Sequence, residues 1–395
     1  MPRAPRLAVL STHPIQYYAP LFQELTNRGM VDVHVFYGWQ GPAEGAYDPG
    51  FGTDVTWDVP LLEGYKHTFL RNTSPDPGTH HFRGIVTPEG LTQITRWQPD
   101  AVLVFGWNYW SHLIALRHFK GRVPVLFRGD STLLDEQSGL RQLLRRVVLR
   151  IVYRYVDVAL YVGQHNRSYF EAHGLQGDAI QWVPHAIENR RFRDPEGRYR
   201  REAQAWRATM GIPDTACTFL FAGKLSRKKA PDVILEAFRA LDDERAHLII
   251  GGSGPLEADL KAQAAGHPRV HFIGFQNQSR MPVVYRLGDV VLLPSRGPGE
   301  TWGLAINEAM ASGRAVVASD RVGCAPDLIT PGVNGFVVPA GAVEPLADVM
   351  QQFIAQPELR TRMGQASEKA IAAWSIPETA RRHEAAVMHA LARYA

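Results

Sequence analysis

Short runs of apolar residues alternate along the chain with longer stretches in which apolar positions recur at helical spacing. A strand of a parallel sheet is buried on both faces and a covering helix on one, so this alternation is typical of α/β domains. The first half has predicted strands at 7–10, 33–37, 101–105, 123–127, 158–162 and 180–183. The second half has them at 219–222, 247–250, 270–273, 290–293 and 315–318. We therefore predict two Rossmann-like α/β domains.

A polar, arginine-rich segment at 188–201 separates the two sets of strands. It has little apolar periodicity and contains Pro195 and Gly197, which disfavour regular structure. We place the boundary here, with an N-terminal domain at 1–195 and a C-terminal domain at 196–375, and expect a central cleft between them. The stretch 47–77 is rich in Gly, Pro, Asp and Thr, so we expect it to form a long excursion from the first domain.

Composition fits this organisation and excludes several classes of protein. The 395 residues exceed what one hydrophobic core usually supports, and 45% of them are hydrophobic. A formal net charge of +4 is too small to require a nucleic-acid partner. Cys217 and Cys324 are far apart, which argues against a disulfide framework or a zinc site. The start lacks the apolar core of a signal peptide, so we expect a cytoplasmic protein.

One predicted helix, at 140–155, has a marked division between apolar and basic positions. Leu140, Leu144, Val147, Val148, Ile151 and Tyr155 share one face, and Arg141, Arg145, Arg146, Arg150 and Arg154 fall outside it. We expect the apolar face to pack on the first sheet, with the arginines in solvent. The alternative is peripheral contact with an anionic membrane that carries a lipid-linked substrate.

Two loops of the second domain have the residues of an anion-binding site. In an open parallel sheet, ligands gather where strands end and helices begin. After the strand at 219–222 come Gly223, Lys224 and Lys229, which together offer close backbone approach and two positive charges. A second turn, which includes Gly252, follows the next strand. Alone, the first loop could also be a solvated basic loop, and glycine turns such as the second are common for packing reasons.

The segment 294–310 adds two carboxylates at helical spacing. Glu300 is predicted to lie in a loop at a strand end, with Glu308 about two turns into the following helix. Such a pair accepts hydrogen bonds from sugar and ribose hydroxyls, while Gly303 lets backbone N–H groups reach a phosphate. A helix cap plus a solvent-facing glutamate remains the alternative.

Taken together, these motifs resemble a known family. Gly223-Lys224, Lys229, the turn Gly252-Ser253-Gly254-Pro255, Pro294-Ser295 and Glu300-x7-Glu308 have the order and spacing of the retaining glycosyltransferases of family 4. That family has the two-domain fold called GT-B, in which the last helix, here 376–395, crosses back to the N-terminal domain. The resemblance is most specific between Cys217 and Val338, and the order of strands and helices extends it over nearly the whole chain.

The resemblance implies a role for each matching residue. Glu300 would contact the donor sugar, Glu308 the ribose, and Lys224 and Lys229 the diphosphate of a UDP or GDP sugar. The remaining donor-binding positions would be Gly223, Gly252, Phe275, Gln276, Ser295, Trp302, Gly303 and Leu304. Lys224 stands where arginine is more usual, so the charge is kept and bidentate phosphate binding is lost.

Candidates for acceptor binding follow strands of the first domain. His13 and Gln16 stand where many relatives have a glycine-rich loop, and we also name His13 as a catalytic candidate. Trp107 and Asn108 follow another strand and have the stacking and hydrogen-bonding groups that sugars need. Arg128 and Asp130 follow a third, where some relatives have a catalytic histidine whose role cannot be transferred to arginine. Each of these sets also has an ordinary structural interpretation, in the core or as an ion pair.

The predicted reaction needs no cofactor and no metal, because the lysines supply the positive charge and no Asp-x-Asp motif accompanies the phosphate loop. The partners would be a nucleotide sugar and a carbohydrate or lipid-linked carbohydrate acceptor, in the synthesis of cell-surface polysaccharide or glycolipid. Two alternatives stay open on the same fold: a sugar-nucleotide epimerase or sugar-phosphate synthase, and a catalytically silent nucleotide-sugar-binding protein. A nicotinamide dehydrogenase is disfavoured because no Gly-x-Gly-x-x-Gly follows the first strand.

Overall fold

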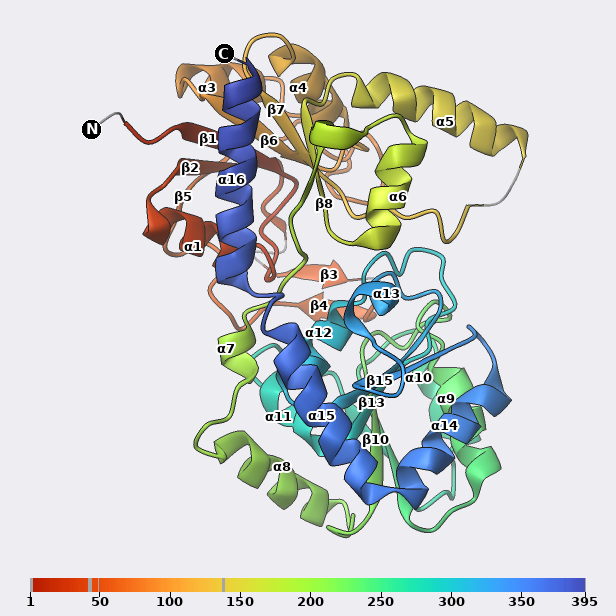
Figure 1. Ribbon diagram of the computed structural model, residues 1–395. Coiled ribbons are helices and arrows are strands. Elements are labelled where there is room, and N and C mark those ends of the chain that lie inside the picture. The colour runs from red at the N-terminus through yellow and green to blue at the C-terminus, as the bar shows by residue number, and fades with distance from the viewer. Residues whose placement is uncertain (1–2, 42–44, 49, 137–138, 395) are drawn as a thin grey trace. The chain divides into compact units, whose positions relative to one another are not determined.

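The computed structural model describes residues 3–41, 45–48, 50–136 and 139–394 (Figure 1). The chain divides into two compact units. Unit 1 consists of Met1–Ala46, Val55–His185 and Ile376–Ala395, and unit 2 of Tyr47–Asp54 and Ala186–Ser375. Each unit is built on a parallel sheet covered by helices, as the alternating pattern predicts. The predicted fold class, two Rossmann-like α/β domains, is confirmed.

The sheet of unit 1 has seven strands in the order β5-β2-β1-β6-β7-β8-β9. All adjacent strands that pair in it are parallel. The strands are β1 (Arg6–Ser11), β2 (Asp32–Tyr37), β5 (Lys66–Phe69), β6 (Ala101–Phe105), β7 (Val125–Arg128), β8 (Val158–Tyr161) and β9 (Ile180–Trp182). The central strands are almost wholly apolar and buried, because helices cover both of their faces.

Six α-helices and one short 3-10 helix belong to unit 1 among the described residues. They are α1 (Ala19–Arg28), α3 (Gly90–Arg96), α4 (Trp110–Phe119), α5 (Leu140–Tyr153), α6 (Gln164–Ala172), η1 (Gly177–Ala179) and α16 (Ile376–Tyr394), with no residue of unit 2 among them. The last helix, α16, packs in unit 1 as expected. There Arg28 of α1 forms a bidentate ion pair with Glu384, and Arg382 lies 3.9 Å from the centre of the Trp182 ring.

The sheet of unit 2 has six strands in the order β12-β11-β10-β13-β14-β15, and all its pairs are parallel. The strands are β10 (Cys217–Ala222), β11 (Ala246–Gly251), β12 (Val270–Gly274), β13 (Val290–Leu293), β14 (Ala315–Ser319) and β15 (Gly335–Val338). The helices are α7 (Asn189–Phe192), α8 (Arg198–Thr209), α9 (Pro231–Leu241), α10 (Glu257–Gln263), α11 (Met281–Leu287), α12 (Leu304–Ala311), α13 (Ala325–Leu328), α14 (Val343–Ala355) and α15 (Pro357–Ile371). The inner faces of β10, β11 and β13 meet α9 and α14 in a buried apolar core.

Two edge strands escape the sequence pattern. β5 lies inside the stretch 47–77, which we expected to be a long excursion from the first domain and in which we predicted no strand. β5 is an edge strand, and its residues are half-buried or exposed. Because its side chains are not enclosed on both faces of the sheet, its sequence is not a continuous apolar run. β15 is similarly a short edge strand that follows a turn. Two further short strands, β3 (Ala46–Asp48) and β4 (Thr53–Val55), form a separate two-stranded sheet.

The change of unit falls between His185 and Ala186 rather than at residue 196. The segment 186–195 lies in unit 2, where Asn189 donates to the carbonyl of Ile371 and Arg286 donates to the carbonyl of Phe192. The segment Tyr47–Asp54 is also part of unit 2, although unit 1 flanks it in the sequence.

The prediction for the helix at 140–155 is wrong in one respect. A helix forms, but its expected core face is exposed: Leu140, Leu144, Val147, Val148 and Ile151 all lie at the surface. The sheet is instead covered by Leu149, Val152 and Tyr153, which lie on the opposite side of α5. The amphipathic pattern therefore marks a surface and not the contact with the core.

Among the described residues, no helix is both long enough and apolar enough to cross a bilayer. Both cysteines are buried as free thiols, and burial raises the pKa of Cys217 to about 12. Neither cysteine is therefore a nucleophile in this structure.

Three histidines of unit 1 make the fold sensitive to acid. His112, His185 and His383 are buried, and burial lowers their pKa from 6.5 to about 4, about 3 and about 3, respectively. The positive charge of Arg128 lowers the last two further. Between about pH 4 and 6.5 the unfolded chain therefore binds more protons than the folded chain, so stability present above pH 6.5 is lost as the pH falls.

We predict that the free energy of unfolding of the chain decreases between pH 7.5 and pH 5 by about 2 kcal/mol for each buried histidine. Urea unfolding at several pH values measures this slope. His383→Gln should make the slope shallower, because one titrating group is removed from the unfolded state. An identical slope in His383→Gln and the unmodified chain would contradict the assignment.

Candidate functional site

The carboxyl ends of four neighbouring strands bring the predicted donor-binding residues to one edge of unit 2. β12, β11, β10 and β13 are adjacent in the sheet, and all are parallel. Phe275 and Gln276 follow β12, Gly252 follows β11, Gly223 follows β10, and the loop with Ser295 and Glu300 follows β13. This is the edge of an open α/β sheet at which ligands bind.

Two glycines allow the loops of this edge to approach one another closely. Gly252 has φ of 127°, and a Cβ atom there would collide with the carbonyl oxygen of Gly223. Gly303 has φ of 97°, and its Cβ would lie 2.7 Å from Val322. Both positions therefore need glycine. Because Gly303 caps α12 without a side chain, no side-chain cap occupies the first N–H groups of that helix.

Lys229, Glu300 and Ser295 form a compact cluster at the end of β13. The Lys229 ammonium lies 2.8 Å from Oε1 and 2.7 Å from Oε2 of Glu300. The Ser295 hydroxyl donates to Oε2 at 3.1 Å. Glu300 is only 6% exposed, so its carboxylate depends on these partners for the interactions that water would otherwise supply.

Glu308 is held by a residue that the sequence analysis missed. It lies on α12 and is buried, and the hydroxyl of Tyr285 on α11 donates to its Oε2 at 2.7 Å. On the same helix, Asn307 accepts a hydrogen bond from the indole of Trp302 at 2.9 Å. Trp302 is buried and packs against Trp374, and these contacts hold the loop between β13 and α12 in place. The helical spacing predicts the position of Glu308 but gives no signal for Tyr285.

Lys224 is positioned by a segment distant in the sequence. Its ammonium lies 4.8 Å from the centre of the Phe51 ring, a cation–π contact within unit 2. The Phe51 ring also meets Phe275 edge-on at 4.9 Å, and Ser253 donates to the carbonyl of Phe51 at 2.9 Å. Phe51 therefore joins the loops after β10, β11 and β12. Nothing in the glycine-rich stretch around Phe51 indicates this role in advance.

This edge of unit 2 offers complementary groups for an anionic, hydroxyl-rich ligand. Lys224 and Lys229 supply positive charge, the start of α12 supplies backbone N–H groups, and Glu300 and Glu308 supply acceptors. In the chain alone, Lys229 and Glu300 neutralise each other. A diphosphate beside Lys229 and sugar hydroxyls beside Glu300 would replace that pairing with contacts of the same kinds.

The acceptor candidates also gather at one edge, in unit 1. β1, β6 and β7 are neighbours, and His13, Asn108 and Asp130 follow them in that order. The His13 imidazole lies 2.9 Å from the Thr12 hydroxyl. Burial lowers the pKa of His13 to about 4, so it is a neutral hydrogen-bonding group at neutral pH.

Arg128 does not offer its guanidinium to a ligand in this structure. It is 2% exposed, and it donates to the carbonyl oxygens of Val183 at 3.0 Å and Pro184 at 3.1 Å. Its guanidinium also lies 6.0 Å from the centre of the Tyr18 ring. These contacts give Arg128 a structural role at the end of β7, and its proposed role in acceptor binding remains a prediction.

The other acceptor candidates differ in exposure. Asn108 is exposed, whereas Gln16 and Asp130 are half-buried. Trp107 packs partly against the core of unit 1, which limits the area available for stacking on a sugar. Their roles in binding remain predictions.

Within the described part of the chain, Asp76, His80 and His81 are the one group of three potential metal ligands that lie close together. Asp76 and His80 are exposed, and the three residues belong to unit 1, not to the loops that hold Glu300. Metal independence of the donor site remains a prediction.

Comparison with known proteins points to one enzyme class. Residues 202–370 match the family model described as "Glycosyl transferases group 1". The D-inositol 3-phosphate glycosyltransferase of Saccharomonospora viridis is 34% identical over 197 residues, which are 46% of this chain and 44% of that protein. The alignment thus spans less than half of that relative. The enzyme of the same name from Nocardia farcinica is 27% identical over 96% of this chain and 88% of its own.

Among solved structures, Anabaena HepE in complex with UDP-glucose is similar in fold, with a TM-score of 0.69. The alignment covers 96% of this chain and 98% of HepE at 17% identity, which shows the fold alone. The two Rossmann-like units therefore have the GT-B arrangement of strands and helices. The matched group is broader than family 4, so membership of family 4 remains a prediction.

The buried cluster predicts a specific stability pattern. We expect Lys229→Met to lower the free energy of unfolding by about 2 kcal/mol, because Glu300 keeps its charge and loses its cation while Lys229 itself is partly exposed. The double variant Lys229→Met/Glu300→Gln should recover most of this loss. Arg227→Met, at an exposed position of the same loop, is the matched control and should change stability by no more than about 0.5 kcal/mol. Additive losses in the double variant would contradict the pairing.

Proposed function

We propose that this chain is a GT-B glycosyltransferase that moves a sugar, with retention of configuration, from a nucleotide-diphosphate donor to a hydroxyl acceptor. The observation that carries the proposal is the cluster of Lys229, Glu300 and Ser295 beside the glycine-capped start of α12. The match of residues 202–370 to group 1 glycosyltransferases supports it independently.

In the proposed complex, unit 2 binds the donor. Lys224 and Lys229 hold the diphosphate, and the N–H groups at the start of α12 add further donors. Glu308, fixed by Tyr285, accepts hydrogen bonds from the ribose, and the loop at Phe275 and Gln276 meets the base. UDP is the first nucleotide to test, because the structure of HepE, which shares the fold, is a complex with UDP-glucose.

The reaction breaks the bond between the anomeric carbon and the diphosphate oxygen. Negative charge then grows on the diphosphate while the sugar becomes cation-like, so the lysine ammonium groups stabilise the transition state more than the ground state. Glu300 orients the sugar through its hydroxyls. The acceptor oxygen attacks the anomeric carbon on the face that the diphosphate leaves, and a phosphate oxygen takes the acceptor proton. The products are the glycoside and the nucleoside diphosphate, without a protein nucleophile.

The acceptor side of the proposal rests on unit 1. His13, Gln16 and Asn108 supply neutral hydrogen-bonding groups at the carboxyl edge of the sheet, and Asp130 supplies a carboxylate there. This chemistry fits a carbohydrate or lipid-linked carbohydrate acceptor. We place the enzyme in the cytoplasm, in the assembly of cell-surface polysaccharide or glycolipid.

The direct test is slow hydrolysis of the donor. We predict that one member of a panel of UDP and GDP sugars is cleaved slowly to the free sugar and the nucleoside diphosphate. NMR spectroscopy measures this cleavage. The sugar that is released first should have the same anomeric configuration as the sugar in the donor. Conversion to an epimeric nucleotide sugar would instead favour an epimerase, and binding without cleavage in any acceptor mixture would favour a silent binding protein.

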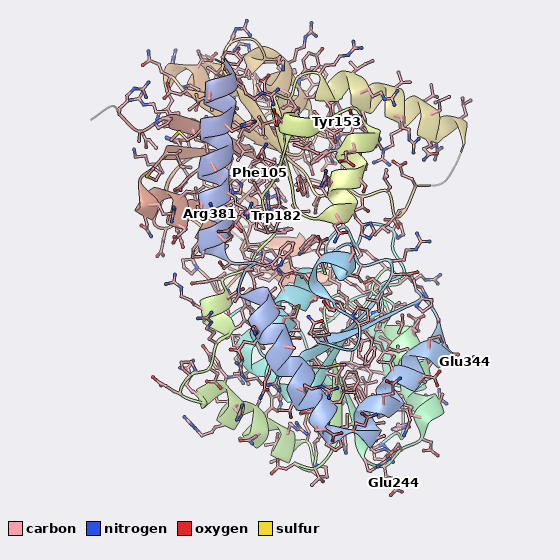
Figure 2. The ribbon with its side chains drawn as sticks, viewed as in Figure 1. Phe105, Tyr153, Trp182, Glu244, Glu344 and Arg381 are labelled. Atoms are coloured by element: carbon pink, nitrogen blue, oxygen red, sulfur yellow. The ribbon has the colours of Figure 1, made fainter. Side chains whose placement is uncertain are left out.

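Glu300→Gln should reduce turnover by at least about 100-fold and change the affinity for the nucleoside diphosphate by less than about threefold. The reason is that Glu300 acts on the sugar and not on the nucleotide. Glu244→Gln is the matched control: Glu244 is exposed and lies between α9 and β11, at the opposite edge of the sheet (Figure 2). Unchanged turnover in Glu300→Gln would remove Glu300 from the mechanism.

We further predict that EDTA leaves turnover unchanged, because lysine ammonium groups and helix N–H groups neutralise the diphosphate. The measurement is initial rate before and after dialysis against EDTA. Loss of activity that only magnesium or manganese restores would contradict this part of the mechanism.

A further inference from the structure

Helix α5 has two apolar faces, and the core uses only one of them. Leu149, Val152 and Tyr153 pack into unit 1, and Tyr153 is labelled in Figure 2. At about 100° per residue, a second row of large aliphatic residues lies on the opposite side of the helix. This row consists of Leu140, Leu143, Leu144, Val147, Val148 and Ile151. We call it the outer row of α5.

The outer row concentrates exposed apolar surface in one place. Its six residues are each between 48% and 73% exposed. In the described part of the chain, thirteen large hydrophobic residues are exposed, so nearly half of them lie on this one helix. Single exposed aliphatic residues are ordinary, whereas a contiguous row along a helix marks an interaction surface. Figure 1 shows α5 extending outward from the rest of unit 1, with its first turns farthest from the sheet.

The charges beside the outer row all have one sign. The segment 139–156 contains five arginines and no Asp or Glu. At helical spacing, Arg141 lies along one border of the row and Arg150 along the other, and Arg154 follows the row at the C-terminal end of the helix. These three are exposed. Arg146 pairs with Glu136 at 3.5 Å, and Arg145 donates to the Tyr169 hydroxyl at 3.4 Å, so these two face the body of unit 1.

From this arrangement we infer that α5 docks the chain on an anionic lipid bilayer. The outer row enters the boundary between headgroups and acyl chains, and the arginines on both borders meet lipid phosphates. Arginine suits this position because its aliphatic stem extends over apolar surface while the guanidinium reaches the headgroups. The helix lies in the plane of the membrane surface and does not cross it.

A second copy of the chain fits this surface less well. A symmetric dimer through the outer rows would bring the arginines of two α5 helices together, with no acidic residue on the helix to neutralise them. An anionic bilayer offers both of the partners that the surface needs, hydrocarbon for the row and negative charge for its borders. The charges of the helix thus favour lipid over self-association.

This inference is independent of the proposed reaction, because it uses no residue of the candidate donor or acceptor sites. If the proposed function also holds, the docked enzyme would reach acceptors carried by the lipid surface. The membrane test below contains neither nucleotide sugar nor acceptor, so failure of one proposal leaves the other measurable.

The experiment is flotation of the full chain with vesicles of phosphatidylcholine alone and of phosphatidylcholine mixed with phosphatidylglycerol. We expect binding to the anionic vesicles, weaker binding to the neutral ones, and a loss of binding as salt is raised. The triple variant Leu144→Ser/Val147→Ser/Val148→Ser should weaken binding by at least about tenfold, because the apolar contact is removed. The set Arg141→Gln, Arg150→Gln and Arg154→Gln should weaken it by about fivefold for each arginine removed.

Matched controls are Val333→Ser and Arg362→Gln, which change exposed residues of unit 2 and should leave vesicle binding unchanged. Unchanged circular dichroism and thermal unfolding of the α5 variants would show that they are folded. Three results would overturn the inference: no binding to anionic vesicles, equal binding by the folded α5 variants and the unmodified chain, or a concentration-dependent dimer in sedimentation that the serine variant abolishes while vesicles remain unbound.

Discussion

The C-terminal half of this protein depends on the neutralisation of one buried carboxylate. Glu300 is almost fully buried and would be costly to hold as an anion without Lys229 and Ser295 beside it. That requirement fixes the loop after β10 against the loop after β13, and it places a cation and an acceptor side by side. In the proposed complex, the same pair separates to meet a ligand that carries both phosphate and hydroxyl groups. Structural and chemical roles therefore coincide at these residues.

Much of this half could be predicted from the sequence, because its signals are local. Glycine in such loops is typical of a positive φ and of a close approach between chain segments. Gly252 and Gly303 show both features in the structure. The eight-residue spacing of Glu300 and Glu308 places them on a loop and on the following helix. Long apolar runs identify the buried strands, because a central parallel strand has no polar face. Edge strands such as β5 lack that signal and were missed.

Contacts between residues distant in the sequence could not be predicted in this way. Phe51 reaches Lys224 and Phe275 from a segment with no apolar pattern, and Tyr285 reaches Glu308 from another helix. Arg128 is a candidate from the sequence because of its charge and its place after a strand, but in the structure it is buried and donates to backbone carbonyls. For α5, periodicity correctly indicated an amphipathic helix but not which face meets the core, since both sides of the helix carry apolar residues.

A crystal structure of the chain grown with UDP, and a second grown with GDP, tests the central claim most directly. The account predicts that one of the two nucleotides lies at the carboxyl edge of unit 2. Its diphosphate should contact the Lys229 ammonium and the backbone at the start of α12, and its ribose should contact Glu308. A nucleotide bound elsewhere, with Lys229 and Glu300 still paired and out of its reach, would contradict the account.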